Sequence, residues 1–170
     1  MNAIVAVTSD WGIGLRGELL IHDRTDMRNF VRLTKGSTVI MGRRTLESFP
    51  GGRPLKGRRN VVLTGNAGLQ VPACDEGTTC ELVHSVEEAL AAVASEDPEH
   101  VWVIGGARVY REMLECCTRA VVTKFETTLP ADAFFPNLDE NPAWKVERVD
   151  EGGFTADGVP FSFVTYLRCE

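Results

Sequence analysis

Short apolar runs recur along the chain, and most of them are too short to form a helix. They are rich in β-branched residues and end at polar or glycine-containing segments, a pattern typical of strands covered on both faces. We expect such strands at Ala3–Thr8, Thr38–Met41, Asn60–Thr64, Cys80–Val83, Val101–Ile104 and Ala120–Phe125.

Between these runs, apolar residues recur three or four positions apart, as they do on one face of an amphipathic helix. Val109, Met113 and Cys117 stand at every fourth place after Gly106. Ser85 lies three residues before Glu88, which is the spacing of a capping box at a helix start. We expect helices over residues 23–34, 44–49, 85–93 and 107–117.

The remaining segments carry loop signals and a closing hairpin. Glycine, proline and asparagine mark loops or turns over residues 9–23, 50–54, 65–79 and 127–142. Two alternating runs, Trp144–Val149 and Pro160–Leu167, flank an Asp157-Gly158 turn signal and predict an antiparallel hairpin. Strand–helix alternation followed by this hairpin predicts one α/β domain over residues 1–170, with a mixed, mostly parallel central sheet flanked by helices.

The turn at Gly105-Gly106 is the first candidate for ligand binding. It joins a buried strand to a helix, and bare backbone N–H groups at the positive end of a helix attract phosphate. Gly42 follows another parallel strand, and ligands of such sheets bind beyond the carboxyl ends of the strands. Because the GxGxxG and P-loop spacings are absent, a tight turn without a ligand remains the alternative at this stage.

Composition and charge narrow the classes of partner. With 44% hydrophobic and 25% charged residues, the chain is ordinary for a globular protein, and its net charge of -6 argues against nucleic acid or an anionic membrane as partner. The first residues lack the basic segment of a signal peptide, so we expect a cytoplasmic location. Five cysteines without CxxC pairs and three unclustered histidines indicate reduced thiols and predict no metal site.

Basic residues gather in one part of this acidic chain. Six of the 18 lie between positions 43 and 59, beside the single acid Glu47. Such an island favours a small, multiply charged anion as ligand, and a solvated loop with scattered arginines is the alternative. The six are Arg43, Arg44, Arg53, Lys56, Arg58 and Arg59.

Asp26 is an acid on an apolar helix face. Phe30 and Leu33 follow it at i+4 and i+7, so the three side chains share one stripe. One interpretation is a half-exposed acid that the helix dipole favours in the first turn. The other is a partly desolvated acid with a raised pKa, able to hydrogen-bond a nitrogen heterocycle and assist its protonation, and the local pattern leaves both open.

Five ordered segments together resemble the dihydrofolate reductase family, and their spacing holds across almost the whole chain. Thr123 and the Ala131–Pro136 segment fit the same family pattern. The five segments are Ala6 followed by Gly12-Ile13-Gly14, Asp26 to Phe30, Val39 to Thr45, Arg53 to Asn60, and Ile104 to Tyr110.

The resemblance implies reduction of 7,8-dihydrofolate to 5,6,7,8-tetrahydrofolate, in support of one-carbon metabolism. Hydride passes from the nicotinamide C4 of NADPH to pterin C6 while N5 gains a proton. Asp26 and Thr123 would be the catalytic residues, and Arg58 would clamp the α-carboxylate of the substrate's glutamate. The implied substrate-binding residues are Ile4, Val5, Ala6, Asp26, Phe30, Leu55, Arg58, Ile104, Tyr110 and Thr123, with Ile4 and Ile104 contributing main-chain carbonyls.

The same resemblance implies a cofactor site between two helix starts, with a cis Gly105-Gly106 peptide. Arg43 or Arg44, with Thr64, would receive the 2′-phosphate, which favours NADPH over NADH. The implied cofactor-binding residues are Ala6, Ile13, Gly14, Gly42, Arg43, Arg44, Thr45, Leu63, Thr64, Gly65, Gly105, Gly106, Ala107, Arg108 and Val109.

Some positions depart from the family pattern. Residues 20–24, Leu-Ile-His-Asp-Arg, replace a segment that usually holds Pro-Trp, so loop closure over the nicotinamide is expected to differ. Leu46 stands where an aromatic residue is common, and Gly65 and His84 replace hydroxyl and basic residues that often help to hold the adenosine phosphate. Antifolate binding and a monomeric state are also expected, while a related pterin or deaminoribosyl-pyrimidine reductase and a non-catalytic nucleotide-binding protein are the alternatives.

Overall fold

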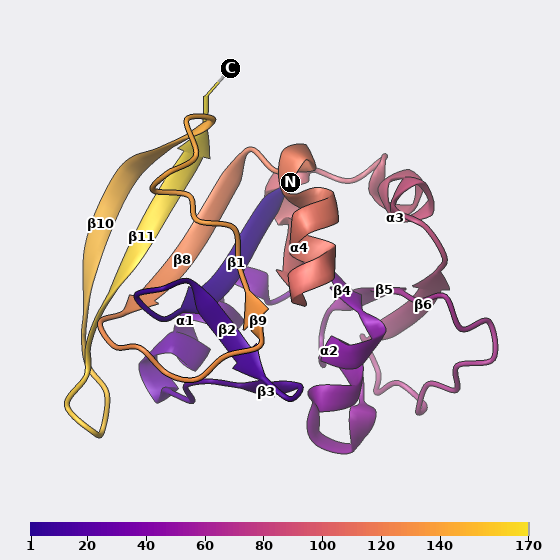
Figure 1. Ribbon diagram of the computed structural model, residues 1–170. Helices are drawn as coiled ribbons and strands as arrows, with labels where there is room; N and C mark the ends of the chain where they lie inside the picture. Colours follow the sequence, from indigo (N-terminus) through magenta and orange to yellow (C-terminus); the bar gives the residue numbers. More distant parts are fainter. Residues whose placement is uncertain (170) are drawn as a thin grey trace.

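In the computed structural model, which describes residues 1–169, an eight-stranded sheet crosses the molecule (Figure 1). Its strands are β1 (Asn2–Val7), β4 (Thr38–Gly42), β5 (Arg59–Leu63), β6 (Thr79–Val83), β7 (Val101–Gly105), β8 (Arg119–Phe125), β10 (Trp144–Phe154) and β11 (Pro160–Arg168). They lie in the order β10-β11-β8-β1-β7-β4-β5-β6. The strands from β8 to β6 run parallel, whereas β11 runs antiparallel to both of its neighbours, β8 and β10. The predicted mixed sheet and closing hairpin are therefore confirmed.

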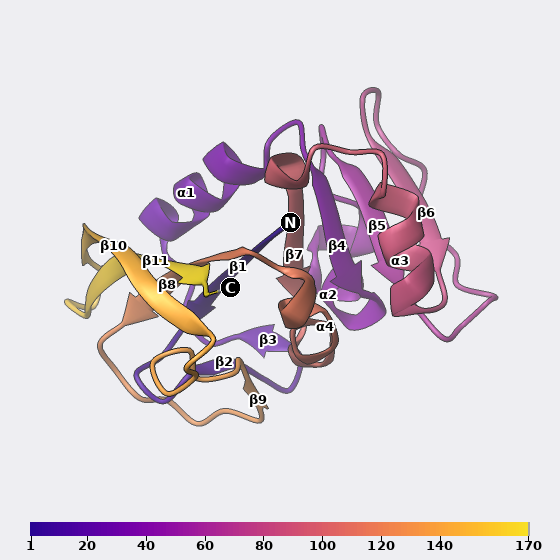
Figure 2. The same ribbon diagram turned by 90° about the horizontal axis from the view of Figure 1, so that it is seen from above.

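Helices pack on both faces of this sheet. They are α1 (Arg24–Thr34), α2 (Arg43–Ser48), α3 (Val86–Val93) and α4 (Ala107–Met113). Phe30 of α1 and Leu46 of α2 belong to one apolar cluster, whereas Ala89 of α3 and Met113 of α4 belong to another. Figure 2 shows α1 and α4 on opposite sides of β1. Because both faces are covered, the parallel strands are apolar throughout instead of alternating.

Local capping signals fix where two of the helices begin. The side chain of Asp23 accepts hydrogen bonds from the backbone N–H groups of Thr25 and Asp26, which starts α1. At α3, the Ser85 hydroxyl accepts from the N–H of Glu88 at 3.1 Å. The capping-box spacing in the sequence is therefore confirmed as a helix start.

Two predicted loops contain short strands instead. β2 (Gly12–Leu15) and β3 (Glu18–Leu19) lie within residues 9–23, and β9 (Ala133–Phe134) lies within 127–142. The three form a second sheet in the order β3-β2-β9. Strands of two to four residues are too short to show a period, and β2 and β9 are paired across more than a hundred residues of chain.

Other boundaries shift for identifiable reasons. The helix expected to reach Cys117 changes at Met113 into a 3-10 turn, which still leaves the Cys117 side chain fully buried. β10 continues beyond the expected end at Val149 because register shifts accommodate Gly152, where a Cβ would lie 2.3 Å from the Phe161 ring. The 3-10 turns are η1 (Pro50–Gly52), η2 (Pro98–His100) and η3 (Leu114–Cys116).

Candidate functional site

Asp26 and Thr123 are hydrogen-bonded to each other although 97 positions separate them. The Thr123 hydroxyl, on β8, donates to Asp26 Oδ1 on α1 at 2.6 Å. Thr123 is 2% exposed and Asp26 is half-buried. Burial raises the pKa of Asp26, the Thr123 hydrogen bond opposes this, and the nearby Asp23 adds to the rise, so the net pKa lies above its ordinary value.

Arg58 is buried but not fully paired. Its Nε donates to the Thr34 hydroxyl at 3.1 Å and one Nη donates to the Lys56 carbonyl at 2.7 Å. Within residues 1–169, its other Nη is buried without a hydrogen-bond partner, and burial lowers the pKa of this guanidinium. The guanidinium carbon lies 5.9 Å from the centre of the Phe30 ring. A buried donor without a partner is costly, so this Nη is suited to an anionic ligand group.

The loop that presents Leu55 and Arg58 is held by Asn60, a residue without a role among the predicted site residues. Asn60 is fully buried, accepts from the Leu55 N–H at 2.8 Å, and donates to the carbonyls of Leu55, Arg58 and Thr79. Asparagine side chains often hydrogen-bond nearby backbone groups, so an asparagine directly after a loop was the available signal. Asn60 therefore holds in place the loop that carries Leu55 and Arg58.

The carbonyl of Ile4 already has a partner in the chain. The Tyr110 hydroxyl, on α4, donates to it at 2.7 Å, and Tyr110 is 3% exposed. Burial raises the pKa of Tyr110, so the phenol is a neutral donor at ordinary pH. The side chain of Val5 packs with Tyr110 in the cluster of α3 and α4, whereas the side chain of Ile4 packs in the other cluster, with Phe30 and Leu55.

Two glycine-led helix starts meet at the carboxyl edge of the sheet. β4 and β7 are parallel neighbours, and α2 and α4 begin directly after Gly42 and Gly106. The Gly105-Gly106 peptide is cis, and a Cβ on Gly42 would lie 3.2 Å from the Val109 side chain. The Thr45 hydroxyl lies within 3.5 Å of the Cβ positions of both adjoining glycines. The arrangement aims two sets of backbone N–H groups into one region, as anion binding requires.

The arginines of this region are partly engaged on their own helices. Arg43 forms an ion pair with Glu47 at 2.9 Å, and Arg108 forms one with Glu112 at 2.6 Å, each one helical turn away. At the end of β5, the Thr64 carbonyl lies 2.8 Å from Nδ1 of His84. Arg44, Leu63 and Gly65 lie along the same edge by their places in the chain.

The segment of residues 12–22, which carries β2 and β3, lies beside the acid. Asp132 accepts from the Arg16 N–H at 3.0 Å, and its own N–H donates to the Gly14 carbonyl at 3.0 Å. Ile13 is 9% exposed. A cavity of about 360 Å³ opens between this segment and α1, lined by Leu19, Ile21, His22, Asp23, Arg24, Asp26 and Met27. Residues of the 20–24 departure thus line a space next to Asp26.

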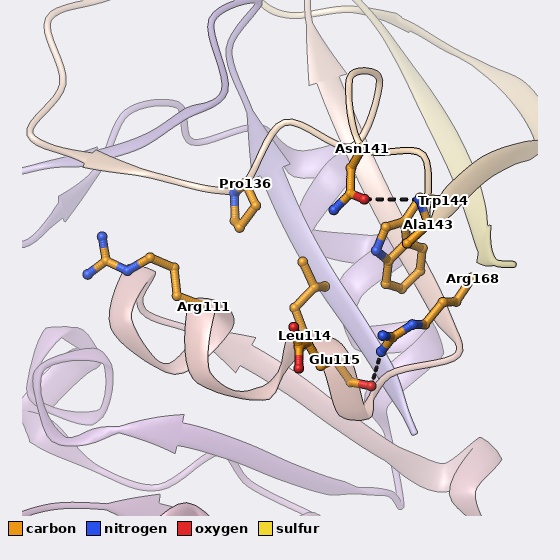
Figure 3. Close-up of a pocket in the computed structure, with 8 residues that line it drawn as sticks. All are labelled: Arg111, Leu114, Glu115, Pro136, Asn141, Ala143, Trp144 and Arg168. Atoms are coloured by element: carbon orange, nitrogen blue, oxygen red, sulfur yellow. Dashed lines mark hydrogen bonds between the residues drawn. The ribbon is translucent and has the colours of Figure 1, made fainter. Parts of the chain in front are cut away.

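A second cavity, of about 260 Å³, lies at the other end of α4 (Figure 3). In this view the Asn141 side chain accepts from the Ala143 N–H, at 3.0 Å, and Arg168 donates to the Glu115 carbonyl. Its lining residues are Arg111, Leu114, Glu115, Pro136, Asn141, Ala143, Trp144 and Arg168, and none of them belongs to the predicted site.

Over residues 1–169, no group of three or more histidine, cysteine, aspartate or glutamate side chains is placed to hold a metal ion. Within the same range, no helix is long and apolar enough to cross a membrane.

Known proteins resemble this chain over most of its length. A model of the dihydrofolate reductase family matches residues 1–168. The bifunctional dihydrofolate reductase-thymidylate synthase of Glycine max is 34% identical, covering 98% of this chain and 33% of that protein, so the chain spans about a third of that relative. The dihydrofolate reductase of Mycobacterium tuberculosis is 39% identical, covering 92% of this chain and 90% of that protein. Dihydrofolate reductase from Enterococcus faecalis, solved with NADP(H) and RAB-propyl, matches with a TM-score of 0.84 at 32% identity, covering 99% of this chain and 96% of that one.

Proposed function

Because the chain belongs to the dihydrofolate reductase family, we propose that it reduces 7,8-dihydrofolate to 5,6,7,8-tetrahydrofolate with NADPH. The observation that carries this proposal is the Asp26–Thr123 pair, a half-buried acid with a raised pKa and a fixed orientation. When bound, NADPH would supply a hydride from its nicotinamide C4 to pterin C6. The chain's own residues would hold the substrate and deliver the proton.

Asp26 would hydrogen-bond the pterin ring and favour the form in which N5 is protonated. Its raised pKa lets the carboxyl group hold a proton at a higher pH than an ordinary aspartate does. Thr123 fixes the orientation of the carboxyl group, because its hydroxyl bonds Oδ1 and leaves Oδ2 for the substrate. The cavity lined by Ile21 and His22 would let water reach this acid.

Arg58 would bind the α-carboxylate of the substrate's glutamate. The buried, unpartnered Nη is the group available for this, while the Nε and the other Nη are held by Thr34 and Lys56. Phe30 and Leu55 would pack on the rings between the pterin and the glutamate. This tail clamp favours dihydrofolate over pterins that lack a glutamate, and over a deaminoribosyl pyrimidine.

The cofactor's diphosphate would lie between the starts of α2 and α4, where backbone N–H groups face it. Arg43 or Arg44, with Thr64, would receive the 2′-phosphate. A non-catalytic nucleotide-binding protein would use the same cradle, but it would gain nothing from a desolvated carboxylate bonded to Thr123.

We also propose that the chain forms one domain and acts as a monomer in the cytoplasm. Antifolates would bind at Asp26, and nucleic acid and membranes would not be partners, which the net charge of -6 supports.

The test is an assay of NADPH oxidation by the purified protein, followed by absorbance, with and without dihydrofolate. We expect oxidation that depends on dihydrofolate and produces tetrahydrofolate. Binding of NADPH without oxidation would support the nucleotide-binding alternative, and oxidation with a pterin that lacks glutamate but not with dihydrofolate would support the related reductases.

A further inference from the structure

Trp11 occupies an unusual place at the start of the segment of residues 12–22. It has a positive φ of 64°, uncommon for a large side chain, and yet it is only 5% exposed. Its ring is stacked on Phe135, with centroids 6.2 Å apart, and lies tilted against Tyr166, also at 6.2 Å. The Trp11 carbonyl accepts from the N–H of Phe135 at 2.9 Å. Ring and backbone together fix this residue against two distant parts of the chain.

A polar network supports the ring of Trp11. The ammonium of Lys124 lies 4.8 Å from the ring centre and donates to Asp139 Oδ2 at 2.5 Å. The Tyr166 hydroxyl donates to Asp139 Oδ1 at 2.6 Å and accepts from Lys124 at 3.3 Å. Burial acts to raise the pKa of Asp139, but the hydrogen bonds from Lys124 and Tyr166 outweigh it, so Asp139 stays ionised near neutral pH. We call Lys124, Asp139 and Tyr166 the lysine network.

The lysine network adjoins the candidate site through two short connections. Lys124 directly follows Thr123, the partner of Asp26, on β8. Trp11 directly precedes β2, which carries Ile13 and Gly14. Successive side chains of a strand point to opposite faces, so β8 can hold the acid on one face and the lysine network on the other.

The network also spans three separate segments, because Lys124 lies on β8, Tyr166 on β11 and Asp139 in the loop before β10. A cation that faces an aromatic ring and is itself hydrogen-bonded holds that ring in one place. The start of the segment of residues 12–22 is therefore positioned by contacts outside that segment.

We propose that Trp11, held by the lysine network, is a positioning residue that sets the segment of residues 12–22 against the nicotinamide end of the cofactor. The proposal rests on the proposed function, because it requires NADPH to bind beside Ile13 and Gly14. In this proposal, Trp11 and the lysine network position the cofactor. Asp26, which does not contact the lysine network, acts on the substrate. A purely structural role for the network would affect the folding free energy alone.

The test compares Lys124→Met with Arg119→Met. Arg119 lies at the other end of β8 and pairs with Glu99 at 2.8 Å, so its loss removes a comparable surface ion pair. For each variant we would measure the melting temperature, the dissociation constants of NADPH and dihydrofolate, and the single-turnover rate of hydride transfer as a function of pH.

We expect Lys124→Met to weaken NADPH binding by about threefold to tenfold, the size of a cation–ring contact, and to slow hydride transfer by a similar factor. In Lys124→Met, the dissociation constant of dihydrofolate and the apparent pKa of the hydride-transfer rate should stay unchanged. Lys124→Arg should recover most of the lost NADPH binding. Arg119→Met should lower only the melting temperature. The proposal would be overturned if Lys124→Met, like Arg119→Met, lowered only the melting temperature. It would also be overturned if Lys124→Arg did not recover NADPH binding, or if Lys124→Met weakened the binding of NADPH and of dihydrofolate equally.

The wild type separates this proposal from the proposed function. If it binds NADPH but does not oxidise it with dihydrofolate, the proposed function fails, while the NADPH constants of the variants still decide the role of Trp11. Trp11→Phe provides the second variant, because it keeps an aromatic ring, and it should weaken NADPH binding less than Lys124→Met does. A larger loss of NADPH binding in Trp11→Phe than in Lys124→Met would contradict the role proposed for the Lys124 ammonium.

Discussion

At the scale of single residues, the surroundings of Asp26 give it a task that an exposed helix-end acid does not have. Asp26→Asn keeps the acceptor for the Thr123 hydroxyl but removes the ionisable group. We expect turnover near neutral pH to fall by about a hundredfold or more, with an unchanged circular dichroism spectrum. Activity within a factor of about three of the wild type would show that Asp26 is merely a first-turn acid.

Although Asp26→Asn should lower turnover, it should raise the stability of the fold at neutral pH. Because the pKa of Asp26 is raised in the folded state, the folded chain binds more protons than the unfolded chain between the ordinary and the raised pKa. Stability therefore falls as pH rises through that window, and Asp26→Asn should melt about 1–3 °C above the wild type at neutral pH, with no gain in acid.

Asp139→Asn is a control in which the melting temperature should change in the opposite direction, because hydrogen bonds from Lys124 and Tyr166 lower the pKa of Asp139. It should melt below the wild type at neutral pH, and this deficit should disappear as the pH falls through the folded pKa of Asp139. A lower melting temperature for Asp26→Asn at neutral pH would contradict the raised pKa of Asp26.

Arg58 and its neighbour Arg59 differ in what they bind. Arg58→Leu removes the unpartnered Nη and should raise the KM for dihydrofolate at least about tenfold, with little change for NADPH. Arg59 pairs with Glu81 and Glu96, so Arg59→Leu should lower the melting temperature and leave both KM values unchanged. Steady-state kinetics on both variants check this, and equal effects of Arg58→Leu on the two KM values would count against a tail clamp.

At the scale of elements, the capping residue Ser85 stabilises the start of α3. Ser85→Ala removes the acceptor for the Glu88 N–H and should cost about 1 kcal/mol, a fall of about 2–4 °C in melting temperature. Because α3 supplies none of the predicted site residues, kcat and both KM values should not change. Ser95→Ala, just beyond that helix, is the control, and a loss of activity in Ser85→Ala would mean that α3 influences the site.

Elements were predictable where their signal is local. The cap at Ser85 and the short apolar run of β7 are both contained in a few consecutive residues. β2 and β9 were missed because both are short and depend on pairing, β2 with β3 and β9 and β9 with β2. The continuation of β10 past Val149 was missed for the same reason, since its register against β11 decides whether Gly152 fits.

At the scale of the whole molecule, the cofactor cradle joins two neighbouring strand–helix units, so binding should stabilise the fold as a unit. NADPH at about a hundred times its dissociation constant should add about 2.7 kcal/mol, which raises the melting temperature by about 5–10 °C. NADH at the same concentration should raise it less, because Arg43, Arg44 and Thr64 are expected to bind the 2′-phosphate. Thermal unfolding with each cofactor checks this, and equal shifts would contradict the preference for NADPH.

The sequence by itself determined the strands of the eight-stranded sheet, the helix starts, the glycine turns and the family resemblance that points to Asp26, because hydrophobic period, caps and ordered motifs are properties of neighbouring residues. Only the tertiary structure decided that Thr123 bonds Asp26 across 97 positions and that one Nη of Arg58 is buried without a partner among residues 1–169. It also decided that Lys124 lies under Trp11. Contacts of this kind depend on the order and register of strands, which place distant residues side by side and which no local pattern encodes.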